Sequence, residues 1–196
     1  MIGRMRVGYL LVGLAVSLVP GTSQTYSAKW LDSPLKQWNI AGAKLPVEPI
    51  QDWDKAYPEC RPLHHPEVGE EEAVAKAGWM IFGSSGDEGK LAVVSGGIGF
   101  DGMCRPDDLQ LFVFVEGKFA GTLSPAPMYA RSDGVVATVS IPESDKIVVE
   151  FKRYEGDDPL CCPSGMSEAT FLIQRDAKGP VATLISVRTP SVRGPA

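Results

Sequence analysis

Residues 109–124 read LQLFVFVEGKFAGTLS and give the clearest structural signal in the chain. Two apolar runs flank the dipeptide Glu116-Gly117. A two-residue loop that ends in glycine is typical of a tight β-hairpin, because glycine readily adopts the positive φ that such turns require. The stretch therefore predicts two antiparallel strands joined at Glu116-Gly117.

Similar short apolar runs continue on both sides of this hairpin. Asp133-Gly134 gives a second hairpin signal, and residues 147–154 alternate apolar and polar side chains as a half-buried strand does. The other predicted strands are residues 79–83, 90–95, 169–176 and 181–188. About eight short strands with short turns must be mostly antiparallel, because a parallel connection needs about a dozen residues or more.

One short helix is predicted at residues 67–77. Glutamates crowd its first turns, Lys76 lies near its end and Gly78 stops it, an order of charges that suits the helix dipole. Before it, residues 29–66 are rich in proline, which opposes both helices and sheet ladders. We therefore expect an extended proline-rich arm, which packs on the domain through its tryptophans.

These elements predict one α+β domain at residues 67–188. In it, an antiparallel sheet is covered by the helix and by the arm at residues 29–66, and disulfides staple the fold. A closed barrel or a sandwich is the alternative architecture. The length after the first residues suits a single domain with its own core. Residues 189–196 are predicted to be a flexible tail.

The first residues have the layout of a secretory signal peptide. Arg4 and Arg6 precede an uncharged apolar run at residues 7–19, which is too short to span a bilayer as a helix. We expect cleavage between residues 23 and 28 and assign residues 1–28 to this peptide. A buried N-terminal helix is the alternative. No later segment is apolar enough to span a membrane, so a soluble exported protein is predicted.

The chain is acidic, with a formal net charge of −5. Removing residues 1–28 would remove two arginines and no acidic residue, which makes the remainder more acidic. Nucleic acids and anionic membrane surfaces attract proteins with a basic face. The charge therefore argues against both kinds of partner.

Four cysteines, Cys60, Cys104, Cys161 and Cys162, predict two structural disulfides in an oxidising compartment. Three pairings are possible. Successive residues of an extended segment point to opposite faces, so we expect Cys161 and Cys162 to bond separate partners at Cys60 and Cys104. A ring between the two neighbours is the disfavoured alternative, and the pair lacks the Cys-x-x-Cys spacing of a redox site.

Arginines near acidic residues supply the candidate ligand site. Arginine forks bind carboxylates through two hydrogen bonds, so internal ion pairs that fix loops are the simpler interpretation. The sharper hypothesis is a cationic pocket for a small anionic ligand. In it, Arg105 and Arg131 contact the ligand, and Asp101 and Asp133 orient the arginines.

Other motifs give weak signals for a cofactor, a metal or catalysis. Residues 97–102 match G-x-G-x-x-G, but Pro106 follows where the dinucleotide motif needs a helix, so no cofactor is predicted. His64 and His65 do not form a zinc spacing with the cysteines, so no metal is predicted. No G-x-S-x-G elbow is present, and none of the many acids is marked out as a glycosidase pair.

Three strings carry a family resemblance: GWMIFG, DGMCRPDDLQLFVFVEGKFAGTLSPAPMYARSDG and FKRYEGDDPLCCPS. They resemble secreted proteins of the LppP/LprE lipoprotein family, and the similarity covers roughly residues 58–175. The resemblance implies an exported cell-envelope protein and supplies no catalytic residues. Lipoproteins of this family need a lipidated cysteine at the signal cut, whereas no cysteine precedes Cys60. We therefore expect a periplasmic or secreted form that is not anchored by such a cysteine.

The sequence predicts a non-enzymatic binding or accessory protein of the envelope. Its partner would be an envelope protein or a small anionic ligand, bound through the loops near Cys104 and residues 125–131. An extracellular hydrolase of cell-wall or polysaccharide material is the alternative. An inhibitor or accessory subunit of an envelope complex is a third class.

Overall fold

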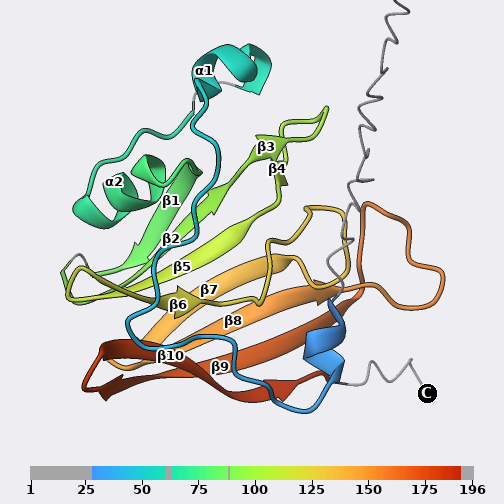
Figure 1. Ribbon diagram of the computed structural model, residues 1–196. Helices are drawn as coiled ribbons and strands as arrows, with labels where there is room; N and C mark the ends of the chain where they lie inside the picture. The colour runs from blue at the N-terminus through green and yellow to red at the C-terminus, as the bar shows by residue number, and fades with distance from the viewer. Residues whose placement is uncertain (1–27, 61–62, 88, 191–196) are drawn as a thin grey trace, which may run out of the picture.

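The computed structural model describes residues 28–60, 63–87 and 89–190 (Figure 1). The predicted signal peptide, apart from Ala28, lies outside the described residues, and so do residues 191–196 of the predicted tail. The described residues form ten strands in two four-stranded antiparallel sheets and one two-stranded ribbon. The prediction of a mostly antiparallel β protein is confirmed, but the number of strands is ten and not eight.

The strands divide by their order in the chain. The first sheet has the order β1-β2-β5-β6, with β1 Met80–Gly86, β2 Leu91–Gly97, β5 Gln110–Val115 and β6 Lys118–Thr122. The second has the order β10-β9-β8-β7, with β7 Val136–Glu143, β8 Lys146–Arg153, β9 Gly165–Asp176 and β10 Gly179–Arg188. The ribbon consists of β3 Gly99–Phe100 and β4 Pro106–Asp107.

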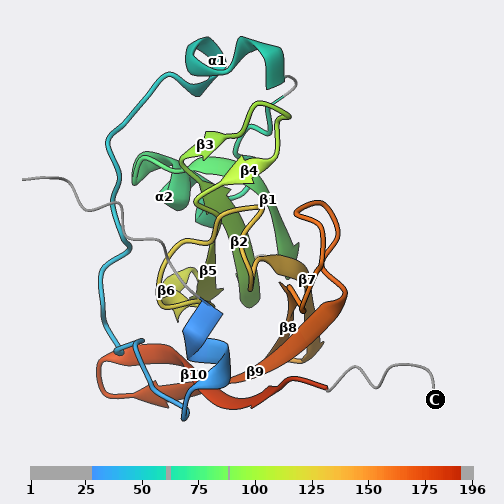
Figure 2. The same cartoon turned by 90° about the vertical axis from the view of Figure 1, so that its right-hand side faces the viewer.

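The two large sheets lie against each other instead of forming the single curved sheet that we expected (Figures 1 and 2). Their edges also meet, because β6 lies beside β10 and β1 lies beside β7. The backbones at these two seams are not paired as in a continuous sheet. The arrangement is therefore a sandwich with both edges drawn together, the alternative that the sequence left open.

Strand β5 is apolar from Leu111 to Val115 because both faces of its sheet are covered. Alternate residues, among them Val113, belong to the core between the two sheets, together with Val149 of β8 and Phe171 of β9. The intervening residues, among them Phe112, pack with Val74 on the other face. Val74 belongs to helix α2 Gly69–Lys76, which confirms the predicted helix within two residues at its start and one at its end. A continuous apolar run is the pattern expected of a strand buried on both faces.

The two predicted hairpins have different outcomes. Glu116 and Gly117 both have positive φ, 52° and 71°, and they join β5 to β6 as expected of a tight turn. The prediction at Asp133-Gly134 is wrong, because the Gly134 N–H donates to the Lys152 carbonyl and this dipeptide leads into β7. The hairpin between β7 and β8 lies instead at residues 144–145. A side chain at Gly134 would also lie 2.5 Å from the Cβ of Ala28.

The segment before α2 is not wholly extended, so the proline-rich arm is not confirmed in that form. It contains a 3-10 helix η1 at Ala28–Asp32, a short helix α1 at Trp53–Ala56 and a 3-10 turn η2 at Pro58–Cys60. Asp52 caps α1 by accepting the Lys55 N–H. Pro58 is the first residue of η2. Proline is tolerated at this position because an N–H there would have no partner within the turn.

Two side-chain amides of this segment close the seam between β6 and β10. Asn39 donates from Nδ2 to the carbonyls of Thr122 and Ala182, and its Oδ1 accepts the Thr122 N–H. Gln37 likewise donates to the Leu184 carbonyl and accepts the Leu184 N–H. The amides thus supply hydrogen bonds that a neighbouring strand would otherwise make.

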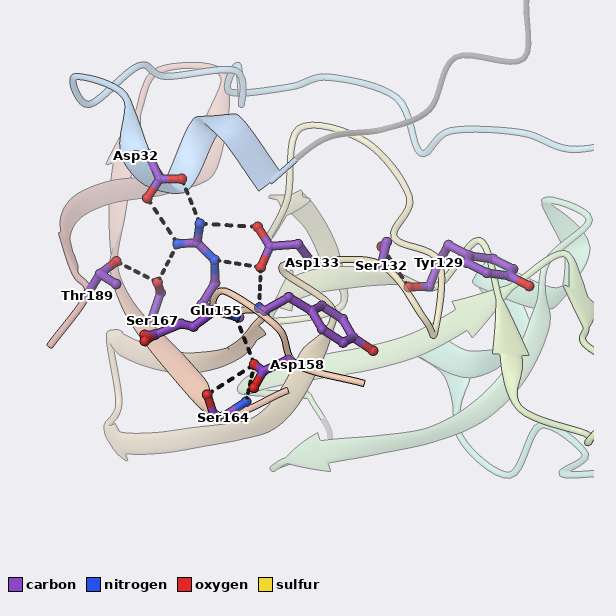
Figure 3. Close-up of polar contacts among 11 residues, drawn as sticks. Asp32, Tyr129, Ser132, Asp133, Glu155, Asp158, Ser164, Ser167 and Thr189 are labelled. Atoms are coloured by element: carbon purple, nitrogen blue, oxygen red, sulfur yellow. Dashed lines mark hydrogen bonds and ion pairs between the residues drawn. The ribbon is translucent and has the colours of Figure 1, made fainter. Parts of the chain in front are cut away.

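A buried cation lies at one end of the sandwich (Figure 3). Arg153 follows Val149 and Phe151 on the inward face of β8 and is 8% exposed. Its guanidinium donates to both oxygens of Asp32 at 3.1 and 2.6 Å and to both oxygens of Asp133 at 3.0 and 3.2 Å. A further hydrogen bond of 2.8 Å goes to Ser167, so the guanidinium makes five hydrogen bonds in all.

This cluster, the Arg153 clamp, consists of Arg153, Asp32, Asp133 and Ser167. It joins η1, the loop before β7, and strands β8 and β9. The hydrogen bond to Asp32 raises the pKa of Arg153 against the opposing effect of burial, and Asp133 raises it further. Asp133 also accepts the Tyr154 N–H, which fixes the start of the loop after β8.

We predict that Arg153→Met lowers the free energy of unfolding by about 2–3 kcal/mol, because it leaves two facing carboxylates without their cation. Chemical denaturation followed by tryptophan fluorescence measures this loss. Arg175→Met is the matched control, since Arg175 pairs with Glu116 where both side chains are more than half exposed. It should cost less than about 1 kcal/mol. Equal losses in the two variants would contradict a special role for the clamp.

Candidate functional site

The ribbon of β3 and β4 presents a tight loop at residues 101–105. The Asp101 Oδ1 accepts the backbone N–H groups of Met103 and Arg105 at 2.8 and 3.1 Å. An aspartate that hydrogen-bonds the backbone two and four residues ahead stabilises a turn without a helix or strand. This turn occupies the place where the G-x-G-x-x-G motif would need a helix.

Two guanidinium groups converge on the other oxygen of Asp101. Arg105 lies 2.8 Å from Oδ2 through Nε and 2.6 Å through Nη2, and the Nε of Arg131 lies 3.5 Å from it. The carboxylate is 9% exposed, whereas the arginine side chains are 34% and 38% exposed. The Arg105 hydrogen bond, reinforced by two backbone N–H groups, lowers the pKa of Asp101 to about 2. The group therefore carries one positive charge in excess, on the side that faces solvent.

The structure thus brings together three of the four predicted ligand residues, Asp101, Arg105 and Arg131. It places the fourth, Asp133, on Arg153 instead. Asp133 is two residues from Arg131 in the sequence, so its ion pair with Arg153 fixes the loop that carries Arg131. Asp101, and not Asp133, is the charge partner of Arg131. Arg153 is not among the residues predicted for a site.

A groove of about 240 Å³ opens beside Arg105. We call it the Arg105 groove, and its walls include Arg105, Pro106, Lys152, Tyr154, Leu160 and Cys161. Arg105 and Lys152 contribute two cations, and the other walls are largely apolar or aromatic. Among the described residues no carboxylate lines this groove, although the chain as a whole is acidic. Such a lining suits a ligand with an anionic group and a small apolar body.

The wall formed by residues 154–164 is ordered by hydrogen bonds although it contains no helix or strand (Figure 3). Asp158 Oδ2 accepts the backbone N–H groups of Glu155 and Ser164, both at 2.8 Å, and the Ser164 hydroxyl at 3.0 Å. These bonds lower the pKa of Asp158. The Tyr154 hydroxyl donates to the Leu160 carbonyl. The groove is therefore formed before any ligand arrives.

The disulfides pair differently from our expectation. Cys60 bonds Cys104, and Cys161 bonds Cys162. The expectation assumed an extended segment, but the Cys162 N–H donates to the Pro159 carbonyl, so the two neighbours lie in a turn. Their side chains consequently do not point to opposite faces of a strand.

The two bridges have different physical effects. Cys60–Cys104 spans a sequence separation of 44 and ties η2 to the loop of the Asp101 group, which by chain entropy contributes about 4 kcal/mol. Cys161–Cys162 closes only its own small ring. It therefore constrains the conformation of the groove wall and does not hold distant segments together. Both of its residues are exposed.

The imidazole of His64 is paired with a carboxylate and not with a serine. His64 Nε2 lies 3.1 Å from the buried Glu71 Oε2, and Ser84 also hydrogen-bonds Glu71. Burial raises the pKa of Glu71, but the hydrogen bonds from Glu67, His64 and Ser84 outweigh it, and the net shift is downward. The carboxylate lies between the serine and the imidazole, so the imidazole is not placed to activate the serine.

The LppP/LprE lipoprotein family model matches residues 87–176. The resemblance found in the sequence is therefore confirmed over that range, which contains the Asp101 group and every groove residue named above. No curated protein and no solved structure matches the chain. Within the part of the chain that the structure describes, no helix has the length and apolar character needed to cross a membrane.

We predict that Cys161–Cys162 is reduced before Cys60–Cys104 in glutathione buffers of decreasing potential. Exposed disulfides are the labile ones. Both cysteines of the Cys161–Cys162 bridge are exposed, whereas the Cys60–Cys104 bridge has one buried cysteine, Cys60, and closes a long loop. Differential alkylation followed by peptide mass spectrometry measures both pairs in one sample. Simultaneous reduction of the two pairs, or earlier loss of Cys60–Cys104, would contradict the assignment.

A second prediction concerns how the stability of the protein depends on pH through Asp101. Because the pKa of Asp101 is about 2 in the folded protein and ordinarily 3.8, the unfolded chain takes up this proton first as the pH falls. The stability that Asp101 contributes is therefore present above about pH 4 and is lost between about pH 4 and pH 2. The difference in melting temperature between the wild type and Asp101→Asn should be constant near neutral pH and shrink in that window. A difference that persists unchanged at about pH 2 would refute this.

Proposed function

We propose that this protein is a non-enzymatic binding protein of the cell envelope, which takes a small anionic ligand in the Arg105 groove. The premise is the match of residues 87–176 to the LppP/LprE lipoprotein family, which supports an envelope location. The observation that carries the binding role is the presence of two cations, Arg105 and Lys152, in a groove that no carboxylate of the described residues lines.

Hydrogen-bonding capacity supports this role. The Nη2 of Arg105 and the Nε of Arg131 form ion pairs with Asp101, but neither has a well-directed hydrogen bond to an acceptor. Buried donors without such a bond are uncommon in folded proteins and call for an explanation. An oxyanion in the Arg105 groove would supply acceptors to the part of the Arg105 guanidinium that lines the groove, which the single Asp101 oxygen does not satisfy.

The groove also limits the ligand class. Its volume of about 240 Å³ accommodates a small group and not a large cofactor. Leu160 and Pro106 offer apolar contact beside the two cations, Arg105 and Lys152. A carboxylate attached to a compact apolar body, such as the C-terminal residue of a peptide, matches both features. A partner protein could present the same chemistry at its chain end.

Export is part of the proposal. The sequence layout of residues 1–28 supports a signal peptide, and two disulfides among the described residues fit an oxidising compartment. We propose an exported form that is periplasmic or secreted.

N-acetylleucine and its neutral amide provide a matched pair of probes. We expect the carboxylate to bind in a calorimetric or NMR titration and the amide to bind at least tenfold more weakly, because charged hydrogen bonds contribute about 1.5–3 kcal/mol. Arg105→Gln and Lys152→Gln should each weaken binding about tenfold, and Arg131→Ala should weaken it less. The control Arg188→Gln removes an exposed pair with Glu168 and should have no effect.

The same variants separate binding from stability. Each is also melted without the probe. Retained binding with a large fall in melting temperature for both Arg105→Gln and Arg131→Ala would make these residues structural ion pairs and end the proposal. Equal affinity for the carboxylate and the amide would end it as well.

A further inference from the structure

A second hollow lies between η1, the residues that follow it and β10. Its volume is about 410 Å³, and we call it the tryptophan pocket. Its walls are Trp30, Pro34, Trp38, Pro125 and Leu184, with Ser33 and Lys36 as the polar members. It shares no lining residue with the Arg105 groove.

The two indoles are held rigidly from behind. Trp30 and Trp38 meet edge to face with centroids 5.3 Å apart. Trp30 also packs on Phe151 at 5.2 Å, and Trp38 packs on Phe171 at 6.0 Å. Both phenylalanines are fully buried core residues. The aromatic walls of the pocket are consequently preformed, which lowers the entropic cost of binding.

Two of the four polar side chains that line the pocket, those of Trp38 and Ser33, are already engaged. The Trp38 indole N–H donates to the carbonyl and hydroxyl of Thr122, each at 3.2 Å. The Ser33 hydroxyl donates to the Lys29 carbonyl at 2.6 Å. A ligand rich in hydroxyl groups, such as a sugar, would lose its bonds to water here and gain few in return. The pocket therefore favours an apolar ligand body.

Lys36 is the exposed exception among the polar members, and no hydrogen bond or ion pair engages it within the described residues. The Trp30 Nε1 also lacks a hydrogen-bond partner among these residues, but that atom is itself buried. A free cation beside an apolar pocket complements an anionic head on a hydrocarbon chain. We propose that the tryptophan pocket binds the hydrocarbon chain of a single-chain anionic amphiphile, with Lys36 at the head group. This site goes beyond the proposed function and does not depend on it.

Calorimetry on the full exported protein tests the proposal, with each probe kept below the concentration at which it forms micelles. Dodecanoate should bind with a stoichiometry of one. Decanoate should bind about fifteenfold more weakly, because it lacks two methylenes and each buried methylene is worth about fourfold in affinity. Dodecyltrimethylammonium, which has the same chain and the opposite charge, should also bind more weakly than dodecanoate.

Three variants locate the binding. Lys36→Gln should weaken dodecanoate binding about fivefold, whereas Lys44→Gln, an exposed lysine of the same segment, should not change it. Ser33→Phe places a ring in the pocket from an exposed position and should abolish binding. Arg105→Gln should leave dodecanoate binding unchanged, which separates this site from the Arg105 groove.

The proposal is overturned by any of three results. These are the absence of saturable binding, equal affinity for the two chain lengths, and full binding by Ser33→Phe. Loss of dodecanoate binding in Arg105→Gln with full binding in Lys36→Gln would assign the carboxylate to the groove and overturn it too. The melting temperature of Ser33→Phe shows whether that variant remains folded, and Lys36→Gln decides the outcome if it does not.

Discussion

The guanidinium of Arg153, held between two carboxylates, is the interaction on which the rest of the structure depends. It occupies an inward position of β8, at the end of an otherwise apolar stripe. A cation at such a position is costly to bury unless its donors are all engaged, and here they bind Asp32, Asp133 and Ser167. Asp32, Asp133 and Ser167 come from η1, the loop before β7 and strand β9. The hydrogen bonds that they accept from Arg153 therefore hold these three segments to β8.

The Arg153 clamp also explains how an acidic protein presents a cationic groove. Asp133 holds the loop in which Arg131 lies, and the Tyr154 N–H on the same carboxylate starts the opposite wall. The Asp101 group is then assembled locally, by a turn whose aspartate gathers backbone N–H groups before it meets Arg105. The Arg153 clamp thus fixes the loop of Asp133 and the start of the loop at Tyr154. The Asp101 turn holds the cationic side chain of Arg105 beside them. The Cys60–Cys104 bridge holds that turn to η2.

Features with local causes could be predicted from the sequence. The Glu116-Gly117 turn needs positive φ at two adjacent positions, the acidic start of α2 suits its dipole, and Asp101 was expected to orient the ligand arginines. The division into two sheets, and the contacts of β6 with β10 and of β1 with β7, depend on segments that are distant in the sequence. The alternation of apolar and polar residues along one strand does not indicate which strands become neighbours. The cysteine pairing was mispredicted because a turn at Cys161 was taken for an extended chain. One signal for the clamp was visible and unused, namely a charged residue at an inward-facing position of an alternating strand.

The seam closed by Gln37 and Asn39 has a consequence for the order in which the chain folds. These residues, near the start of the described chain, bond Leu184 and Ala182 at sequence separations of 147 and 143. Contacts of this range form late, because a long loop must close first. Until β10 is available, the edge of β6 lacks its cover and can pair with another chain. The segment that carries Gln37 and Asn39 must therefore wait for β10, so this side of the sandwich closes only after β10 has been synthesised.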